Sequence, residues 1–311
     1  MAFRIVPDDT KIPFMSQGRP CAYGSIAAIV ASIVLFFAVG LNLGIDFKGG
    51  TLIEVQSRAA IADIADVRAK IGALGFGDVE VTTFGEPNEL LIKIEAQEGG
   101  PEAQAEVVKM VRETLGETEY EYRRVEFVGP RIASELATKG TIAVIVALIG
   151  VLLYIWFRFE WQFAVGAISS LVHDVILTIG FFAVTQIDFN LSSLAAILTI
   201  VGYSLNDTVV VYDRVRELLR KFKQMAIPDL VDLAVNQMLA RTLLTSVTTA
   251  LALFALFFFG GEIIRSFTAA MIWGVVIGTY SSIYIASPVL IYLNLRPGAA
   301  SVPDAAESSK A

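Results

Sequence analysis

Residues Ile197 to Glu217 read ILTIVGYSLNDTVVVYDRVRE, an apolar run at helical length that ends in a cluster of charges. The polar pair Asn206 and Asp207 lies inside the apolar part. A carboxylate near the centre of a bilayer costs about 2.5–3.5 kcal/mol on insertion scales, so it is rare unless it faces the protein interior or a water-filled path. Two questions follow: whether this stretch lies in a membrane, and what its carboxylate does there.

The composition answers the first question. The chain is 55% hydrophobic and 18% charged, whereas a soluble globular domain is about 25% charged. Crossing a hydrocarbon core of about 30 Å takes roughly 20 helical residues. Apolar runs near or above that length occupy 22–43, 140–157, 163–186, 190–212, 242–259 and 267–293. The sequence therefore predicts a polytopic α-helical membrane protein with six transmembrane helices.

Basic residues predict the orientation of these helices, because Arg and Lys beside a span mark its cytoplasmic side. Arg4, Lys11 and Arg19 precede the first run, which places the N-terminus inside. Six spans then place the connection 213–241 inside as well, and it contains Arg214, Arg216, Arg220, Lys221, Lys223 and Arg241. The outside connections 187–189 and 260–266 carry only Arg265. We therefore expect cytoplasmic N- and C-termini.

The hydrophilic segment after the first run is acidic, with 18 acidic and 11 basic residues between Asp46 and Lys139. It begins with GIDFKGG (44–50). Strands are expected at 51–56, 78–84, 89–95 and 119–128, the second and third being joined across 85–88, and helices at 61–74 and 102–116. The first helix places Ile61, Ile64, Val67, Ile71 and Leu74 on one face. This β-α-β-β-α-β order predicts a small ferredoxin-like α+β domain between helices 1 and 2.

Other classes of protein find no support in the residues. The single Cys21 excludes a disulfide framework and a cysteine metal cluster. No basic patch with stacking aromatic residues indicates a nucleic-acid partner, and no GxxxxGK[ST], HExxH or GxSxG motif indicates an enzyme. No cleavable signal peptide is evident, so the first run is expected to stay as an anchor. We expect no cofactor and no metal.

Polar residues within the spans are the candidate functional residues. Asn206 and Asp207 lie in the cytoplasmic half of the fourth span, and Arg241 opens the fifth at a similar depth. We therefore predict that Asp207 and Arg241 lie in contact. In the third span, His173 and Asp174 lie near the middle, and His173 is the only histidine of the chain.

A proton relay is the functional interpretation of these residues. Burial disfavours the charged form of a carboxyl group and a nearby Arg favours it, so such a pair can load and release a proton as the geometry changes. A proton that crosses the membrane releases about 2.3 kcal/mol per 100 mV. Protons are then the coupling ion.

Structural interpretations remain open for each group. Asp207 could pair with Arg241 or Arg214 only to fix helix contacts, and His173 and Asp174 could form a neutral hydrogen-bonded pair. Small polar residues are common where membrane helices pack. On that ground the Ser/Thr face of the fifth span (Thr242, Thr245, Ser246, Thr248, Thr249) and the four-residue series of the last span (Ala270, Gly274, Gly278, Ser282) are predicted to be packing surfaces.

Several motifs resemble the SecF family of bacterial protein-export subunits, which is related to the resistance-nodulation-division superfamily. They are GIDFKGG, VGP-R (128–131), LVHDV (171–175), VGYSLNDTVVVYDRVRE, NQMLARTLLTSVTT (236–249), FGGEIIRSF (259–267) and GTYSSIYIASP (278–288). The resemblance runs in order from about Gly44 to Pro288, and the NDT-containing motif is highly specific.

This resemblance implies six helices that form half of a twelve-helix unit, with SecD as the other half. It implies that the proton-motive force drives preprotein export beside the SecYEG translocon, with a YajC-type accessory subunit among the partners, in the bacterial inner membrane. In that family the positions of Asp207 and Arg241 are linked to proton transfer. A structural assembly subunit, or half of a small-solute transporter, are the alternatives.

The expected organisation is then a cytoplasmic N-terminal segment (1–21), a first transmembrane helix (22–43), a periplasmic α+β domain (44–139), five further helices (140–293) and a cytoplasmic tail (294–311). The tail is rich in Ala, Ser and Pro, which predicts disorder.

Overall fold

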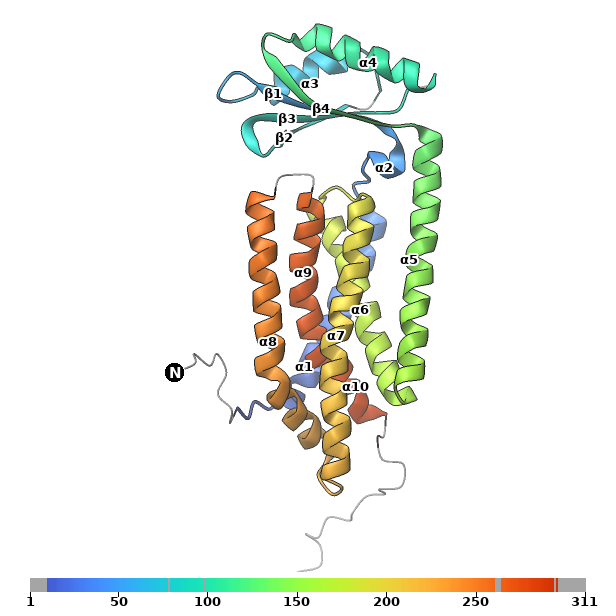
Figure 1. Ribbon diagram of the computed structural model, residues 1–311, viewed down its shortest axis with the longest axis vertical. Coiled ribbons are helices and arrows are strands. Elements are labelled where there is room, and N and C mark those ends of the chain that lie inside the picture. The colour runs from blue at the N-terminus through green and yellow to red at the C-terminus, as the bar shows by residue number, and fades with distance from the viewer. Residues whose placement is uncertain (1–9, 78, 98, 261–263, 294, 296–311) are drawn as a thin grey trace, which may run out of the picture.

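The computed structural model describes residues 10–77, 79–97, 99–260, 264–293 and 295. These form a bundle of long helices with a sheet-and-helix layer at one end (Figure 1). The expected disordered tail lies outside the described residues, as do the first nine residues. Six helices of the described chain are long and apolar enough to cross a membrane.

The layer at the end of the bundle is a four-stranded antiparallel sheet with two helices. Its strands are β1 (Gly50–Ser57), β2 (Val79–Phe84), β3 (Glu86–Ile94) and β4 (Tyr120–Val128), in the order β2-β3-β1-β4. Helix α3 (Ile64–Gly72) follows β1 and α4 (Gly100–Leu115) follows β3, and both lie on the face of the sheet away from the bundle (Figure 1). Alternate strand residues such as Ile53, Val55 and Ile92 point toward these helices and are buried. The predicted α+β segment with its four strands is therefore present.

Two local predictions in this layer are wrong. Ile61 is 74% exposed, because α3 begins only at Ile64, after Asp63 caps its N-terminus by accepting from the backbone N–H groups of Ala65 and Asp66. The turn between β2 and β3 is also shorter than the predicted 85–88. β3 already begins at Glu86, which pairs with Phe84, so that Gly85 alone makes the turn, at φ 80°.

The GIDFKGG segment joins the sheet to the bundle. It forms the short helix α2 (Ile45–Lys48), which lies between the two parts (Figure 1). Gly49 (φ 76°) and Gly50 (φ 139°) then turn the chain into β1. A Cβ on Gly50 would lie 2.6 Å from the carbonyl oxygen of Ile94, so only glycine fits this close approach.

The membrane-spanning helices are α1 (Gly18–Ala38), preceded by the short helix η1 (Phe14–Gln17), then α5 (Pro130–Arg158), α6 (Trp161–Thr185), α7 (Leu191–Lys221) and α8 (Ile227–Phe259). The last span is composite: α9 (Arg265–Ser281), a π-helical segment η3 (Ser282–Ala286) and α10 (Ser287–Tyr292).

The predicted loop 213–241 is wrong. α7 continues to Lys221 and α8 starts at Ile227, so only a short turn joins them. An apolar stripe explains the extension: Val215 and Leu218 of α7 pack with Leu230, Val231 and Ala234 of α8 in one core cluster. The exposed residues of α7 in this region are charged, among them Asp213, Glu217 and Arg220.

α5 begins ten residues before the predicted span. Pro130 stands in its first turn, where a proline fits because its missing N–H is not needed there. Ion pairs one turn apart join Arg131 to Glu135 (3.7 Å) and Glu135 to Lys139 (3.1 Å). This polar start of the helix is adjacent to the sheet (Figure 1).

α6, α7 and the last span form the interior of the bundle. In their apolar windows 56%, 50% and 50% of residues are buried, against 6% in α1 and α5 and 17% in α8. The interior helices pack closely because α9 presents glycines: a Cβ on Gly274 would meet Ile200 at 2.2 Å, and one on Gly278 would meet Ser204 at 3.0 Å. The predicted packing role of this glycine series is confirmed.

Candidate functional site: two carboxyl groups inside the bundle

Asp174 of α6 lies at the centre of a polar network that joins the three interior helices. Its side chain has no exposed surface. Oδ2 accepts a hydrogen bond from Ser204 Oγ of α7 at 2.5 Å and from Ser281 Oγ of α9 at 2.8 Å, and Oδ1 lies 2.9 Å from His173 Nδ1. Ser170 Oγ donates in turn to Ser281 Oγ at 2.8 Å. Two serine hydroxyl donors and the His173 ring therefore contact the carboxyl group in a fully buried site.

Ser170, Ser204 and Ser281 were not predicted from the sequence. Serine is frequent in membrane helices as a packing residue, so its type alone gives no signal. The position of Ser204 does give a signal: it precedes Asp207 by three residues, which places both on one face of α7. The partnership with Asp174 depends on how the helices are rotated in the bundle.

Ser281 is also the last residue before the π-helical segment. π-helical turns occur often at functional sites. Beyond it, the carbonyl oxygen of Ala286 accepts a hydrogen bond from Tyr212 Oη of α7 at 2.9 Å, and a Cβ on Gly166 would lie only 2.2 Å from this hydroxyl group. The irregular segment is thus fixed to α7 at its end and to Asp174 at its start.

Asp207 has a different environment. It is only 3% exposed, and its Oδ2 is buried with no hydrogen-bond partner among the described residues. Buried polar atoms are almost always paired, so an unpaired one indicates a proton, a water molecule or a missing partner group.

Arg241 and Asn206 lie beside this carboxyl group but are exposed. The charge of Arg241 acts on Asp207 electrostatically. Within the described chain, however, no ion pair of 4.0 Å or less and no hydrogen bond joins the two side chains, so the predicted contact is not formed. Arg214, the other proposed partner, binds Gln237 Oε1 (2.7 Å) and Glu217 instead.

The Ser/Thr face of α8 partly joins this interior. Ser246 Oγ and Thr279 Oγ1 of α9 are 2.7 Å apart, and Tyr203 of α7 reaches Ser246 at 3.5 Å. Thr245 and Thr248 bond to carbonyl groups of their own helix. These contacts support the predicted packing role. Over the described residues, no cluster of three or more His, Cys, Asp or Glu side chains is placed to hold a metal ion.

The end of α6 and the start of α7 connect the bundle to the sheet. Asp188 Oδ1 binds Lys93 Nζ of β3 at 2.5 Å and Asn42 Nδ2 at 3.0 Å. Asp46 of the GIDFKGG segment accepts from the backbone N–H of Leu191 at 3.0 Å, at the N-terminus of α7. A cleft of about 520 Å³ lies between the sheet and the helix ends, with Glu54, Lys93 and Arg124 among its lining residues. α7, which carries Asp207, is therefore tied to the segment that leads into β1, and the loop before α7 is tied to β3.

Comparison with known families matches this architecture to one group of proteins. Residues 107–296 match the family described as protein export membrane protein SecD/SecF, C-terminal, and residues 34–61 match the SecD/SecF GG motif. The GG motif match includes GIDFKGG, the segment that links the sheet to the bundle.

Curated relatives agree. The chain is 47% identical to the protein translocase subunit SecF of Magnetococcus marinus over 92% of this chain and 93% of that protein, and 43% identical to SecF of Cereibacter sphaeroides over 96% and 95%. It is 42% identical to the protein translocase subunit SecDF of Brucella abortus, over 99% of this chain but only 40% of that protein's length.

A solved structure shows the same fold. The crystal structure of SecDF from Thermus thermophilus, a translocon-associated membrane protein, matches 93% of this chain and 39% of its own with a TM-score of 0.82 at 32% identity. Family model, relatives and fold give one answer: the chain belongs to the SecD/SecF family of protein-export membrane proteins.

Proposed function

We propose that this chain is a proton-driven subunit of a protein translocase, in which Asp207 gains and loses the coupling proton. The unpaired Oδ2 of Asp207 is the observation that carries the proposal. A carboxyl oxygen buried without a partner is costly as an anion, so the group is poised to change its protonation with its surroundings. Arg241, close enough to act on Asp207 but not bound to it, can favour the anion whenever the helices move together.

A SecD-type protein is the proposed partner. The Brucella and Thermus SecDF proteins carry on one polypeptide both the region matched here and a further region of larger size. Asn206 and Arg241 are exposed at mid-bundle depth, where a polar side chain facing lipid is unfavourable. A second half that packs on this face of α7 and α8 would cover both residues. SecYEG, a YajC-type subunit and exported preproteins are the further proposed partners.

The proposed orientation places the sheet layer, as a ferredoxin-like domain, in the periplasm of a bacterial inner membrane. The basic residues at the turn between α7 and α8 lie at the end of the bundle opposite to the sheet (Figure 1). Since basic residues favour the cytoplasmic side, the sheet is expected on the outer side and the described ends of the chain on the inner side.

Coupling of proton transfer to motion of this domain is also proposed. α7 carries Asp207, and Asp46 caps its N-terminus from the segment that leads into β1. A second SecDF crystal structure, described as a super-membrane-facing form, matches this chain with a TM-score of 0.67 at the same 32% identity. The two SecDF structures thus resemble this chain to different degrees over the matched region, and the described form of the second is the observation that supports this part of the proposal.

The test is preprotein export in cells whose only copy of the subunit carries Asp207→Asn, with assembly measured by co-purification of the SecD-type partner. Asn keeps the shape and removes the titratable proton. We expect export to fall at least tenfold with the complex intact. Normal export would overturn the proposal.

The second candidate is a purely structural assembly subunit, which the satisfied network around Asp174 favours. Exchanging the charges together (Asp207→Arg with Arg241→Asp) separates the two functions. If the two charges serve only to attract α7 and α8 to one another, export tolerates the exchange, whereas a relay loses function while the complex still assembles.

A further inference from the structure

The imidazole ring of His173 is bonded through only one of its two nitrogen atoms. Nδ1 faces Asp174, whereas Nε2 is buried and has no hydrogen-bond partner within the described part of the chain. His173 is 2% exposed. Its other neighbour is the ring of Tyr280, which stacks on it with a centroid distance of 6.0 Å and offers no bond to Nε2.

The contacts of Asp174 fit two protonation states of the His173–Asp174 pair, one with an ionised Asp174 and one with a neutral Asp174. Oδ2 already accepts from two serine hydroxyl groups, and an ionised carboxylate is an acceptor only. In the state with an ionised Asp174, Nδ1 carries the proton that Oδ1 accepts. In that state Nε2 is a lone-pair acceptor, and the described residues offer it no hydrogen-bond donor.

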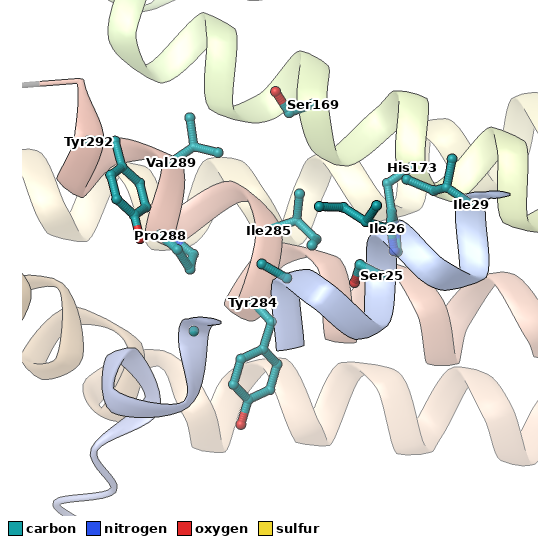
Figure 2. A pocket seen from close by; sticks show the side chains of 12 residues that line it. Ser25, Ile26, Ile29, Ser169, His173, Tyr284, Ile285, Pro288, Val289 and Tyr292 are labelled. Atoms are coloured by element: carbon teal, nitrogen blue, oxygen red, sulfur yellow. The ribbon is translucent and has the colours of Figure 1, made fainter. Parts of the chain in front are cut away.

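Two hollows on either side of α1 reach His173. The first, of about 280 Å³, lies between α1, α6 and the η3–α10 part of the last span. Figure 2 shows the His173 side chain extending from α6 toward Ser25 and Ile29 of α1, with Ser169 one turn away on α6. The second hollow, of about 480 Å³, lies toward the sheet end and is lined almost wholly by apolar side chains. A water molecule needs only about 10–15 Å³ of such volume, so the first hollow, which Ser25 and Ser169 line, has room for several.

We propose that Nε2 of His173 is a proton-exchange site for water that enters the first hollow, and that His173 and Asp174 take up this proton as a pair. A proton from hydronium adds to the Nε2 lone pair, and the Nδ1 proton passes to Asp174 Oδ1. The products are one water molecule, a neutral imidazole with its proton on Nε2, and a neutral carboxyl group. The same heavy-atom contacts serve both states, because the Oδ1–Nδ1 bond only reverses its donor.

This site deepens the proposed function, since it rests on a proton relay in the bundle and adds an entry separate from Asp207. Asp174 is the charged group in contact with His173. The titratable groups near it on the packed helices are Tyr280 of α9, whose ring stacks on that of His173, and Tyr284 of η3, which lines the same hollow. Ser204 ties the pair to α7, one turn before Asp207.

The experiment uses the fact that His173 is the only histidine of the chain. The full-length chain, purified with a histidine-free tag, is labelled with ¹⁵N-histidine and placed in lipid nanodiscs. Nitrogen chemical shifts then report the tautomer, and solvent exchange of the ring N–H proton reports water access. We expect the Nδ1–H tautomer and a ring proton that exchanges with solvent. A ring proton on Nε2 in the resting state, or a proton that does not exchange, would overturn the proposal.

A matched pair of variants tests the route. Ala22→Leu fills the first hollow and should slow ring exchange at least tenfold, whereas Ala31→Leu, in the second hollow, should leave the rate within twofold. Equal rates in both variants would overturn the route through the first hollow. Ile26→Phe serves as the second filling variant if Ala22→Leu does not yield folded protein.

The two proposals fail in different ways. His173 exchange is measured without export, and Asp207→Asn should leave it unchanged. If Asp207→Asn abolishes export but the ring proton of His173 does not exchange with solvent, only the proposal for His173 is overturned. If export is normal in Asp207→Asn, the proposed function is overturned, whatever the exchange rate of the His173 ring proton.

Discussion

Asp174 and Asp207 are both buried carboxyl groups on interior helices, but their surroundings differ. Asp174 accepts hydrogen bonds from α7 and α9 and contacts His173 on its own helix. Asp207 has an oxygen with no hydrogen-bond partner among the described residues, and Arg241, whose charge acts on it, is exposed on α8. The carboxyl group of Asp174 joins three helices, whereas that of Asp207 lacks a hydrogen-bond partner for Oδ2 among the described residues.

The difference separates two uses of a costly group. Removing one partner from a satisfied buried network exposes the remaining donors to an apolar interior, which destabilises the fold. Removing an unpaired acceptor relieves a cost instead. We therefore expect Asp174 to affect folding strongly and Asp207 to affect function at little cost in stability.

The largest expected effect is on unfolding of the Asp174→Ala variant. Three donors lose their acceptor, so the free energy of unfolding should fall by about 2–3 kcal/mol. Asp207→Ala is the matched variant and should change it by less than about 1 kcal/mol, since no hydrogen bond to Oδ2 is lost. Denaturing-detergent titration of the purified chain measures both. Equal losses would contradict the distinction.

A smaller effect is expected where α9 packs on α7. The Cβ of Gly274→Ala would lie 2.2 Å from Ile200, and such overpacking costs about 1–3 kcal/mol. Gly202→Ala on α7 is the control, because nothing lies within 4 Å of its Cβ and alanine favours the helix by up to about 1 kcal/mol. The same titration should show losses for the first variant only. An equal loss of stability in Gly202→Ala would contradict the assignment of the effect to close packing of α9 on α7.

Ser204→Ala tests one bond of the network. Asp174 keeps its other two contacts, so the loss should be about 1 kcal/mol. Thr199→Ala on the same helix is the control, since Thr199 is exposed and bonds only to the carbonyl oxygen of Ala195 at 2.7 Å. Its stability should be unchanged. If Ser204→Ala were equally silent, the short bond to Asp174 would contribute nothing to the fold.

The smallest effect is expected outside the bundle, where the Lys93–Asp188 pair is partly exposed. Exposed ion pairs contribute about 0.2–1 kcal/mol, so Lys93→Met should lower stability by about 0.5 kcal/mol or less. Hydrogen exchange of the backbone at 187–189 should nevertheless become faster, because this loop loses its contact with the sheet. Lys109→Met, in a pair confined to α4, is the control. Unchanged exchange in Lys93→Met would show that the pair does not hold the sheet.

Periodicity predicted much of this fold, because its signal is local. The strands from Gly50 to Val128 and the six apolar runs follow from alternation and length. The long extensions of α7 and α8 were missed because one apolar stripe, with Leu218 and Leu230, sustains them while charged faces lower the hydropathy. The sequence also singled out Asp174 and Asp207 as unusual.

The contacts of these two carboxyl groups could not be predicted. Asp174 meets residues 30 and 107 positions away, and their meeting depends on the rotation of each helix and on the π-helical segment after Ser281. A rotation of one residue, about 100°, would remove the bond to Ser204. The absent contact between Asp207 and Arg241 has the same origin, since depth in the membrane can be estimated from sequence whereas the facing of two helices cannot.

The central claim is that Asp207 changes its protonation while Asp174 holds the helices together. Proton uptake by the complex of this chain with its SecD-type partner, reconstituted in liposomes under an imposed pH gradient and membrane potential, tests it most directly. With Asp207→Asn, the account predicts a flux at least tenfold lower, with the complex assembled and its unfolding unchanged. Undiminished proton flux through the Asp207→Asn complex would contradict the account.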